Sequence, residues 1–157
     1  MSPDKKIEQF DLVVIGSGPA GVTAAIQAAK LNKKVCIVEK SINKLGGSWI
    51  YWGTLPSKAL RESLETLNDL NHHLGNEWMK RVRHGLHADK LFGQAHDVSR
   101  QEENLVKKYI KSNKIKLIEG FGSIEDEFHV RIKIQDKDSM LIKTKFILIS
   151  TGSKPDR

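Results

Sequence analysis

The sequence predicts an α/β fold in which a parallel sheet with crossover helices is joined to a small β-hairpin or meander. A strand pattern, a glycine-rich turn, a helix pattern and a second strand pattern follow one another within about thirty residues, the order of a parallel βαβ unit. Later in the chain, two apolar segments flank a polar turn, which is typical of a hairpin. The 157 residues have the size of one domain.

The βαβ unit comes first along the chain. Phe10–Ile15 is a short apolar run rich in β-branched residues, typical of a strand that is buried on both faces. Pro19–Leu31 has small and apolar residues at helical spacing, which permits close packing on a sheet. Lys34–Val38 is expected to be the second strand.

The middle of the chain is predicted to be helical at both ends. Ser57–Leu70 has leucines at helical spacing, and Pro56 just ahead of it is a start signal. The polar segment Asn71–Ala95 is expected to be a loop with one short helical piece around Glu77–Arg83. Val98–Ser112 resumes the helical pattern.

The last part of the chain predicts strands again. Ile115–Ile118 is expected to be a strand that leads into a turn at Gly120–Gly122. His129–Ile134 and Met140–Ile142 predict a hairpin around the sequence DKDS, and Phe146–Ile149 predicts a final buried strand.

Composition narrows the classes of protein that are expected. Lysine and arginine total 26 and aspartate and glutamate 19, a net charge of +7 that permits an anionic partner. The positive charges are scattered without interleaved aromatics or a nucleic-acid motif, so no nucleic-acid partner is expected. The apolar stretch Leu12–Ala29 is interrupted by three glycines and a proline, unlike a signal peptide or membrane span. With Cys36 as the sole cysteine, we expect a cytoplasmic protein that contacts no membrane.

A glycine-rich turn predicts nucleotide binding. The spacing G-x-G-x-x-G lies between the first strand and its helix and comprises Gly16, Ser17, Gly18, Pro19, Ala20 and Gly21. The first glycine permits the turn, the second lets the backbone approach a pyrophosphate, and the third permits close helix packing. Glu39 ends the second strand, where a carboxylate accepts hydrogen bonds from an adenosine ribose, and the adjacent Lys40 is included in the predicted site. The turn alone leaves FAD and NAD open.

A second segment points to one cofactor. Leu45–Lys58 resembles the redox-active segment of the pyridine nucleotide-disulfide oxidoreductases, which bind FAD at their N-terminal glycine turn. Ser150-Thr151-Gly152 resembles the Ala-Thr-Gly segment of that family, so the resemblance spans essentially the whole chain. It implies a Rossmann-like FAD-binding domain over residues 1–157, with FAD as cofactor and NAD(P)H as co-substrate of the complete enzyme.

The chain departs from that family at its redox centre. Trp49 and Thr54 occupy the positions of the two cysteines in the disulfide-forming members, and Cys36 is expected to be a small buried hydrophobe. Threonine at the second position is similar to the soluble pyridine nucleotide transhydrogenases, which pass hydride between nicotinamide nucleotides through FAD alone. Trp49 departs from their pattern too.

The resemblance also implies roles for individual residues. Lys58 is expected beside the reactive edge of the flavin, where a cation stabilises the reduced ring, and Thr54 is expected to place a hydroxyl near it. Trp49 and Trp52 either stack on the ring or pack in the core. The other implied cofactor-binding residues are Gly46, Gly47, Ser48, Gly122, Thr151 and Gly152.

Complete family members continue into nicotinamide-binding and dimerisation domains and form homodimers. This chain has only one G-x-G-x-x-G, so we expect those domains to be absent from it and the isolated chain to be inactive. Two alternatives remain: a small NAD-binding Rossmann dehydrogenase, although no Tyr-x-x-x-Lys pair is evident, and a non-catalytic module that binds nucleotide or nucleic acid. His84 and His87 are one helical turn apart but have no third ligand, so no metal site is expected.

Overall fold

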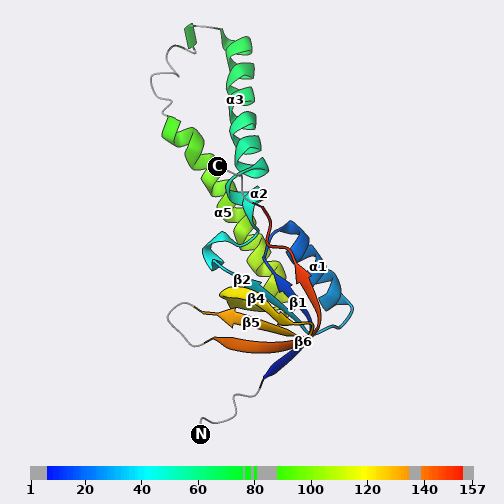
Figure 1. The fold of residues 1–157 in the computed structure, drawn as a ribbon. Coiled ribbons are helices and arrows are strands. Elements are labelled where there is room, and N and C mark those ends of the chain that lie inside the picture. Colours follow the sequence, from blue (N-terminus) through cyan, green and yellow to red (C-terminus); the bar gives the residue numbers. More distant parts are fainter. Residues whose placement is uncertain (1–6, 76, 79, 81–87, 135–138, 154–157) are drawn as a thin grey trace. The chain divides into compact units, whose positions relative to one another are not determined.

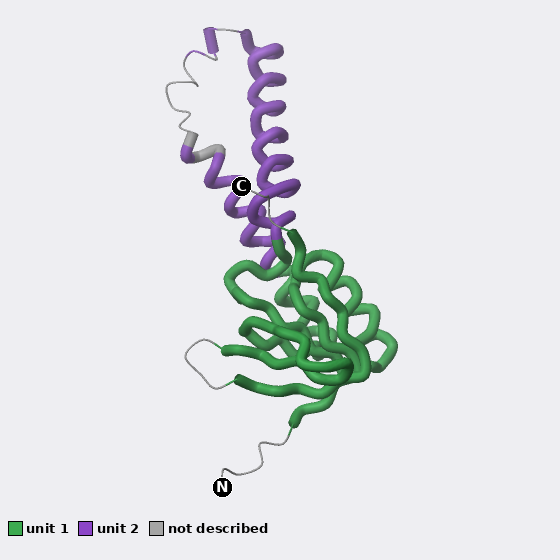
Figure 2. The backbone as a smooth tube through the Cα atoms, in the orientation of Figure 1, with its two compact units in different colours: residues 1–47, 105–157 green, residues 48–104 purple. Residues whose placement is uncertain are grey.

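The computed structural model describes residues 7–75, 77–78, 80, 88–134 and 139–153. Along the chain the elements are β1 (Glu8–Ile15), α1 (Pro19–Lys30), β2 (Val35–Glu39), a 3₁₀ turn (Ile42–Lys44), α2 (Ser48–Tyr51), α3 (Thr54–Leu74), α5 (Ala88–Ser112), β3 (Lys116–Glu119), β4 (Phe121–Asp126), β5 (His129–Lys133) and β6 (Met140–Ile149) (Figure 1). They form two compact units, residues 1–47 with 105–157 and residues 48–104 (Figure 2).

The first unit contains a six-stranded mixed sheet. Its strand order is β3-β2-β1-β6-β5-β4. The four strands β3, β2, β1 and β6 are parallel, whereas β6, β5 and β4 pair antiparallel. In the central register Val13 lies between Cys36 of β2 and Ile147 of β6. The predicted α/β fold with a parallel sheet and a small meander is confirmed.

Glycines let other elements pack closely on both faces of β1. A Cβ atom added to Gly21 of α1 would lie 3.0 Å from Cγ1 of Val14, so Val14 faces that helix. The next residue, Ile15, points the other way because strand side chains alternate. A Cβ atom at Gly122 of β4 would lie 3.3 Å from Ile15 and 3.2 Å from Val38. The meander therefore covers the face that α1 leaves open.

Branched apolar side chains from the parallel strands and the meander form the core of this unit. The cluster comprises Phe10, Val13, Ile15, Cys36, Val38, Ile118, Val130, Ile132 and Ile142. Cys36 is fully buried, as expected, and burial raises the pKa of its thiol to about 12. A thiol in this environment is protonated and unreactive at neutral pH.

The second unit is built on helices. The hydroxyl of Ser99 in α5 donates to the carbonyl of Ile50 in α2 at 2.7 Å, which ties these two helices together. The hydroxyl of Ser63 in α3 lies 3.0 Å from Oε1 of Gln94 in α5. Of the helices that the structure describes, none combines the length and the apolar character needed to span a bilayer.

The predicted elements of the βαβ unit are confirmed to within two residues at each end, and the strand predicted at Ile115–Ile118 is β3. The turn predicted at Gly120–Gly122 is wrong, because β4 begins at Phe121 and only Gly120 bends between strands. The hairpin of β5 and β6 is confirmed. Its second strand and the final strand predicted at Phe146–Ile149 are one continuous strand.

The helices are longer than predicted. The helix α3 includes Pro56 in its first turn and extends to Leu74, and α5 begins at Ala88, so much of the predicted loop Asn71–Ala95 is helical. Glu77, Trp78 and Lys80 are helical. Residues 81–87, which include His84 and His87, lie outside the described residues, and so does the predicted turn at 136–138.

Candidate functional site

The predicted nucleotide site lies where parallel strands end. β1 is followed by the glycine turn, its neighbour β2 by Lys40, and its other neighbour β6 by Ser150. Because these strands are parallel, their carboxyl ends lie at the same edge of the sheet. The chain moves from β1 to β2 on one side and returns through β6 on the other, and such switch points are where open α/β sheets bind ligands.

Two glycines of the turn are required by packing. Gly16 has a φ of +104°, and a Cβ atom there would lie 2.4 Å from the carbonyl oxygen of Ser150. At Gly21 a Cβ atom would lie 2.3 Å from the carbonyl oxygen of Gly16 and 2.5 Å from Oγ of Ser150. Both distances are shorter than real Cβ contacts allow, so these two positions exclude any side chain.

Gly18 differs, because it faces open space. A Cβ atom added there would meet no atom of the described residues within 4 Å. Gly18 is also the N-cap of α1; it offers no side-chain cap, and Pro19 follows as the first helical residue. The first backbone N–H groups of a helix favour an anion. The space in front of Gly18 is therefore open, positively polarised and suited to a pyrophosphate.

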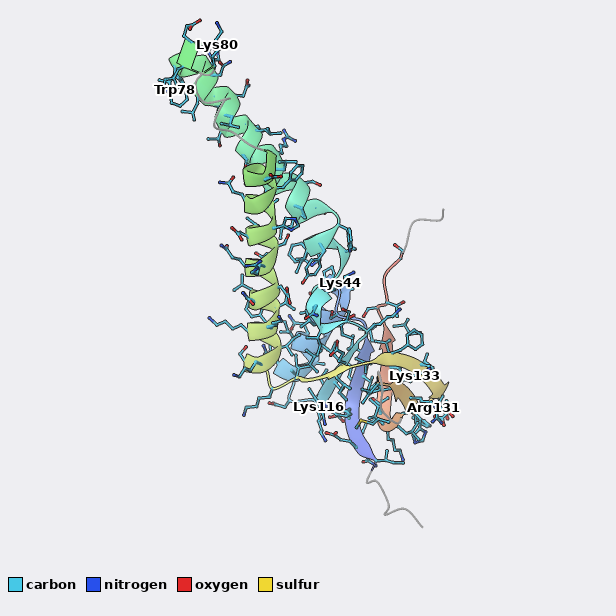
Figure 3. All side chains as sticks on the ribbon, turned by 90° about the vertical axis from the view of Figure 1, so that its left-hand side faces the viewer. Lys44, Trp78, Lys80, Lys116, Arg131 and Lys133 are labelled. Carbon is cyan, nitrogen blue, oxygen red and sulfur yellow. The ribbon has the colours of Figure 1, made fainter. Side chains whose placement is uncertain are left out.

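A second glycine pair lies against this opening. The N–H of Gly46 donates to the carbonyl of Ser17 at 3.1 Å, and Gly47, at a φ of +78°, approaches the Cα atom of Gly18 so closely that a Cβ would lie 3.0 Å away. Lys44, just before this pair, marks the loop in Figure 3. The structure thus brings together two glycine segments that are separated by about thirty residues in the sequence.

Glu39 lies beside the same turn. Its Oε2 accepts hydrogen bonds from the N–H of Ser17 at 2.9 Å and from the Ser17 hydroxyl at 2.6 Å, and its Oε1 accepts one from the N–H of Ser41 at 3.1 Å. The N–H of Gly120 donates to the Glu39 carbonyl at 2.8 Å. The carboxylate is therefore held at the rim of the site in a fixed orientation.

The segment after β6 completes this rim. Ser150 donates through its N–H to the carbonyl of Ile15 at 2.9 Å, and its hydroxyl lies 3.1 Å from the carbonyl oxygens of Ile15 and Gly16. Thr151 and Gly152 follow and are exposed. Ser150 anchors the glycine turn, a role that the sequence did not indicate, because only the resemblance to an Ala-Thr-Gly segment singled out these residues.

Two further residues of this unit that were predicted to bind the cofactor, Lys40 and Gly122, contact residues outside the glycine turn. Lys40 is exposed, with Nζ 6.0 Å from the ring centre of Phe121. Gly122 packs against the side chains of Val38 and Ile15, and its proposed contact with a cofactor stays a prediction.

The remaining predicted residues belong to the second unit. Trp49 in α2 is half-buried, whereas Trp52 is 76% exposed. Of the two alternatives predicted for Trp52, packing in the core is therefore wrong. Thr54 begins α3 and is exposed. Lys58 lies one turn later, is exposed, and pairs with Glu62 at 3.8 Å, an i, i+4 contact that contributes little in water. Ser48 is the exposed first residue of α2.

No metal centre is evident in the described part of the chain, where no three histidine, cysteine or acidic side chains are grouped suitably.

Comparison with known proteins gives one consistent result. Residues 10–157 match the family model described as pyridine nucleotide-disulphide oxidoreductase. A soluble pyridine nucleotide transhydrogenase of Photobacterium profundum is 34% identical over 157 residues, covering 99% of this chain and 33% of that protein. A dihydrolipoyl dehydrogenase of Zymomonas mobilis is 30% identical over 147 residues, covering 94% of this chain and 31% of that protein. The chain thus spans about a third of the length of the curated relatives it matches.

A solved structure supports the same fold. The HOCl-induced flavoprotein disulfide reductase RclA of Escherichia coli matches with a TM-score of 0.72 at 22% identity, covering 94% of this chain and 29% of that chain.

Proposed function

The chain belongs to the pyridine nucleotide-disulfide oxidoreductase family, and from this premise we propose that its 157 residues form the FAD-binding portion of a transhydrogenase-like oxidoreductase. One observation carries the proposal. The glycine turn, the Gly46–Gly47 pair, Glu39 and the Ser150–Gly152 segment converge at the carboxyl ends of parallel strands, around an opening in front of Gly18.

The residues at this opening fit the adenosine diphosphate half of FAD. The uncapped N–H groups at the start of α1 would hold the pyrophosphate, and the absence of a side chain at Gly18 lets it approach. Glu39 would accept a hydrogen bond from the ribose. The first turn of α1 contains no acidic residue that would repel a phosphate. These features support FAD or NAD equally, and the family relationship favours FAD.

The flavin, when bound, supplies the capacity to accept and donate a hydride. The chain's own residues would bind and orient the cofactor, and the exposed ammonium group of Lys58 is the cation proposed to stabilise a reduced ring. Thr54 is proposed to lie near the ring. The only cysteine in these residues, Cys36, is buried in the sheet and cannot form an internal disulfide. The activity that we propose for the whole protein is therefore hydride transfer between nicotinamide nucleotides through FAD alone.

Three further expectations belong to the same proposal. They are that residues 1–157 act as one FAD-binding domain, that the whole protein forms a homodimer, and that it works in the cytoplasm. Reduced thiols are the norm in that compartment, and the single buried cysteine is consistent with it.

Direct titration tests the proposal. The purified chain is freed of bound cofactor and titrated with FAD, NAD⁺ and FMN, and binding is followed by calorimetry and by quenching of flavin fluorescence. We expect FAD to bind with a shifted flavin absorption spectrum, and FMN, which lacks adenosine, to bind far more weakly. Binding of NAD⁺ without FAD would instead support a nicotinamide-dependent dehydrogenase. Binding of DNA with a steep salt dependence would support a nucleic-acid module.

A further inference from the structure

Ser17, the second residue of the glycine turn, directs its side chain into the protein. Its exposed fraction is 0%. Its hydroxyl donates to Oε2 of Glu39 at 2.6 Å, and its N–H donates to the same oxygen at 2.9 Å. Its carbonyl accepts the N–H of Gly46. All the polar groups of Ser17 are therefore satisfied within the protein, and its hydroxyl contacts the predicted ribose-binding carboxylate.

The two oxygens of Glu39 are left in different states. Oε2 accepts both hydrogen bonds from Ser17, whereas among the described residues Oε1 accepts only the N–H of Ser41 at 3.1 Å. A carboxylate offers about four acceptor positions, two on each oxygen. Oε2 is therefore filled, and Oε1 keeps one position for another donor. Glu39 as a whole is only partly buried.

We propose that Ser17 is a positioning residue that sets the specificity of this site for the ribose of an adenine nucleotide. Its hydroxyl fixes the rotation of the Glu39 carboxylate and fills Oε2, so that Oε1 is presented to a ribose hydroxyl. The inference rests on the proposed function, since it assigns the adenosine half of the cofactor to this rim.

The chemistry of Ser17 accounts for this role. The N–H groups of Ser17 and Ser41 hold one oxygen of the Glu39 carboxylate each, and the Ser17 hydroxyl adds a third donor that fills the remaining position on Oε2. Hydrogen bonds that involve an ionised group are short and strong, and the 2.6 Å contact is of this kind. Substitution by alanine would leave the two backbone donors, remove the shortest of the three hydrogen bonds and free a position on Oε2, which loosens the orientation of the carboxylate.

Two nucleotide probes measure this role without enzymatic activity. ADP carries both ribose hydroxyls, and 2′,3′-dideoxy-ADP carries neither. Calorimetry gives their dissociation constants and the ratio between them. For the unaltered protein we expect ADP to bind about tenfold or more tightly, the usual value of a hydrogen bond to a charged group. In Ser17→Ala the ratio should fall to about threefold or less, and in Ser17→Thr, which keeps the hydroxyl, it should recover.

A matched variant separates positioning from stability. Thr144 is a second buried hydroxyl of the same unit, and it donates to the carbonyl of Phe146 at 2.9 Å, away from the turn. Thr144→Val removes that hydroxyl and keeps the shape of the side chain. It should lower the melting temperature and leave the ratio unchanged. If Ser17→Ala does not fold, Ser17→Cys, which keeps the volume but donates weakly, gives the same reading.

The outcomes are distinct. A ratio that stays near the unaltered value in a folded Ser17→Ala or Ser17→Cys protein overturns the inference, and so does an unaltered protein that does not discriminate between the two probes. If the unaltered protein binds neither ADP nor FAD, the proposed function itself fails. A ratio that falls in Ser17→Ala and Glu39→Gln alike, with no further fall in the double variant, supports the inference.

Discussion

At the scale of single residues, the three glycines of the G-x-G-x-x-G motif differ in the space that surrounds them. Gly16 and Gly21 have no space for a side chain, because backbone and side-chain atoms of neighbouring segments occupy it. Gly18 has space, yet the spacing motif requires glycine there. The pyrophosphate that we propose in front of Gly18 would account for glycine at that position.

Gly18→Ala should separate binding from folding. Its backbone, at φ −64° and ψ 174°, suits alanine, and within the described part of the chain the added methyl meets no atom within 4 Å. The melting temperature of the cofactor-free protein should stay the same or rise slightly. FAD affinity should fall by about 1–3 kcal/mol, the usual cost of a methyl group in an occupied space. Thermal unfolding and FAD titration measure the two effects, and unchanged affinity would argue against a pyrophosphate at this position.

Gly21→Ala should have the opposite profile. The new methyl would overlap the carbonyl oxygen of Gly16 and the hydroxyl of Ser150, so α1 must move away from β1. Overpacking of this kind costs about 1–3 kcal/mol or more, which lowers the melting temperature of the cofactor-free protein by several degrees. Gly93→Ala, a helical glycine with open space around it, is the control and should not destabilise the protein. A Gly21→Ala protein as stable as the unaltered one would contradict the close packing described above.

The sequence could predict that the two glycine segments and Glu39 come together, but not the contacts among them or the part that Ser150 plays. The spacing of the glycines and the position of Glu39 after a strand are local features that sequence displays directly. The hydrogen bond between Ser17 and Glu39, and the clamp of Ser150 on Gly16, join residues that are 22 and 134 positions apart. Such contacts follow from strand order, which periodicity does not contain.

At the scale of elements, burial explains which predictions were right. β1 and β2 are apolar runs because both faces are covered, so their composition marks them clearly. β4 was missed because nearly all of its residues are exposed and no alternation appears. The start of α5 was missed because Ala88–Ala95 includes a glycine and polar residues, which lower the helix propensity of this segment. Tertiary context overrides such a weak local preference.

Ion pairs join the strands at the other end of the sheet. Glu8 of β1 pairs with Lys116 of β3 and, at 3.6 Å, with Lys34 before β2; Lys116 is labelled in Figure 3. Asp11 of β1 accepts from Lys145 of β6 at 2.7 Å and from the N–H of Lys34 at 2.8 Å. The hydrogen bond from Lys116 is the main cause that lowers the pKa of Glu8. The hydrogen bond from Lys145 is the main cause that lowers the pKa of Asp11.

These carboxylates should make stability fall in acid. Because their folded-state pKa values lie below the ordinary 4.5 and 3.8, their contribution is complete above those values and is lost as pH falls through the folded-state pKa values. Melting temperatures between pH 7 and 3 should therefore decline below about pH 4.5. The double variant Glu8→Gln and Asp11→Asn should show a shallower decline. Glu127→Gln, an exposed carboxylate between β4 and β5, is the control, and an equal effect of both changes would contradict this assignment.

At the largest scale, the match with the Photobacterium relative covers 99% of this chain but only 33% of that protein. A polypeptide of these residues has one glycine motif of the dinucleotide type. The proposed site would hold one nucleotide, whereas the proposed hydride exchange between nicotinamide nucleotides requires a second one. Binding and turnover should therefore be separable properties of this polypeptide.

A polypeptide of these 157 residues, loaded with FAD, should show little or no turnover with NADH or NADPH and a dye acceptor. Hydride transfer is fast when a nicotinamide is held against the flavin in a near-attack geometry, and such positioning contributes roughly 7–11 kcal/mol of barrier reduction. Without a second nucleotide site, reduction should depend linearly on nucleotide concentration and remain close to the rate of free FAD. Steady-state assays with both nucleotides, with free FAD as control, measure this. Saturable turnover well above free FAD would place a nicotinamide site within these residues, since only a bound nicotinamide gives a rate that levels off with its concentration.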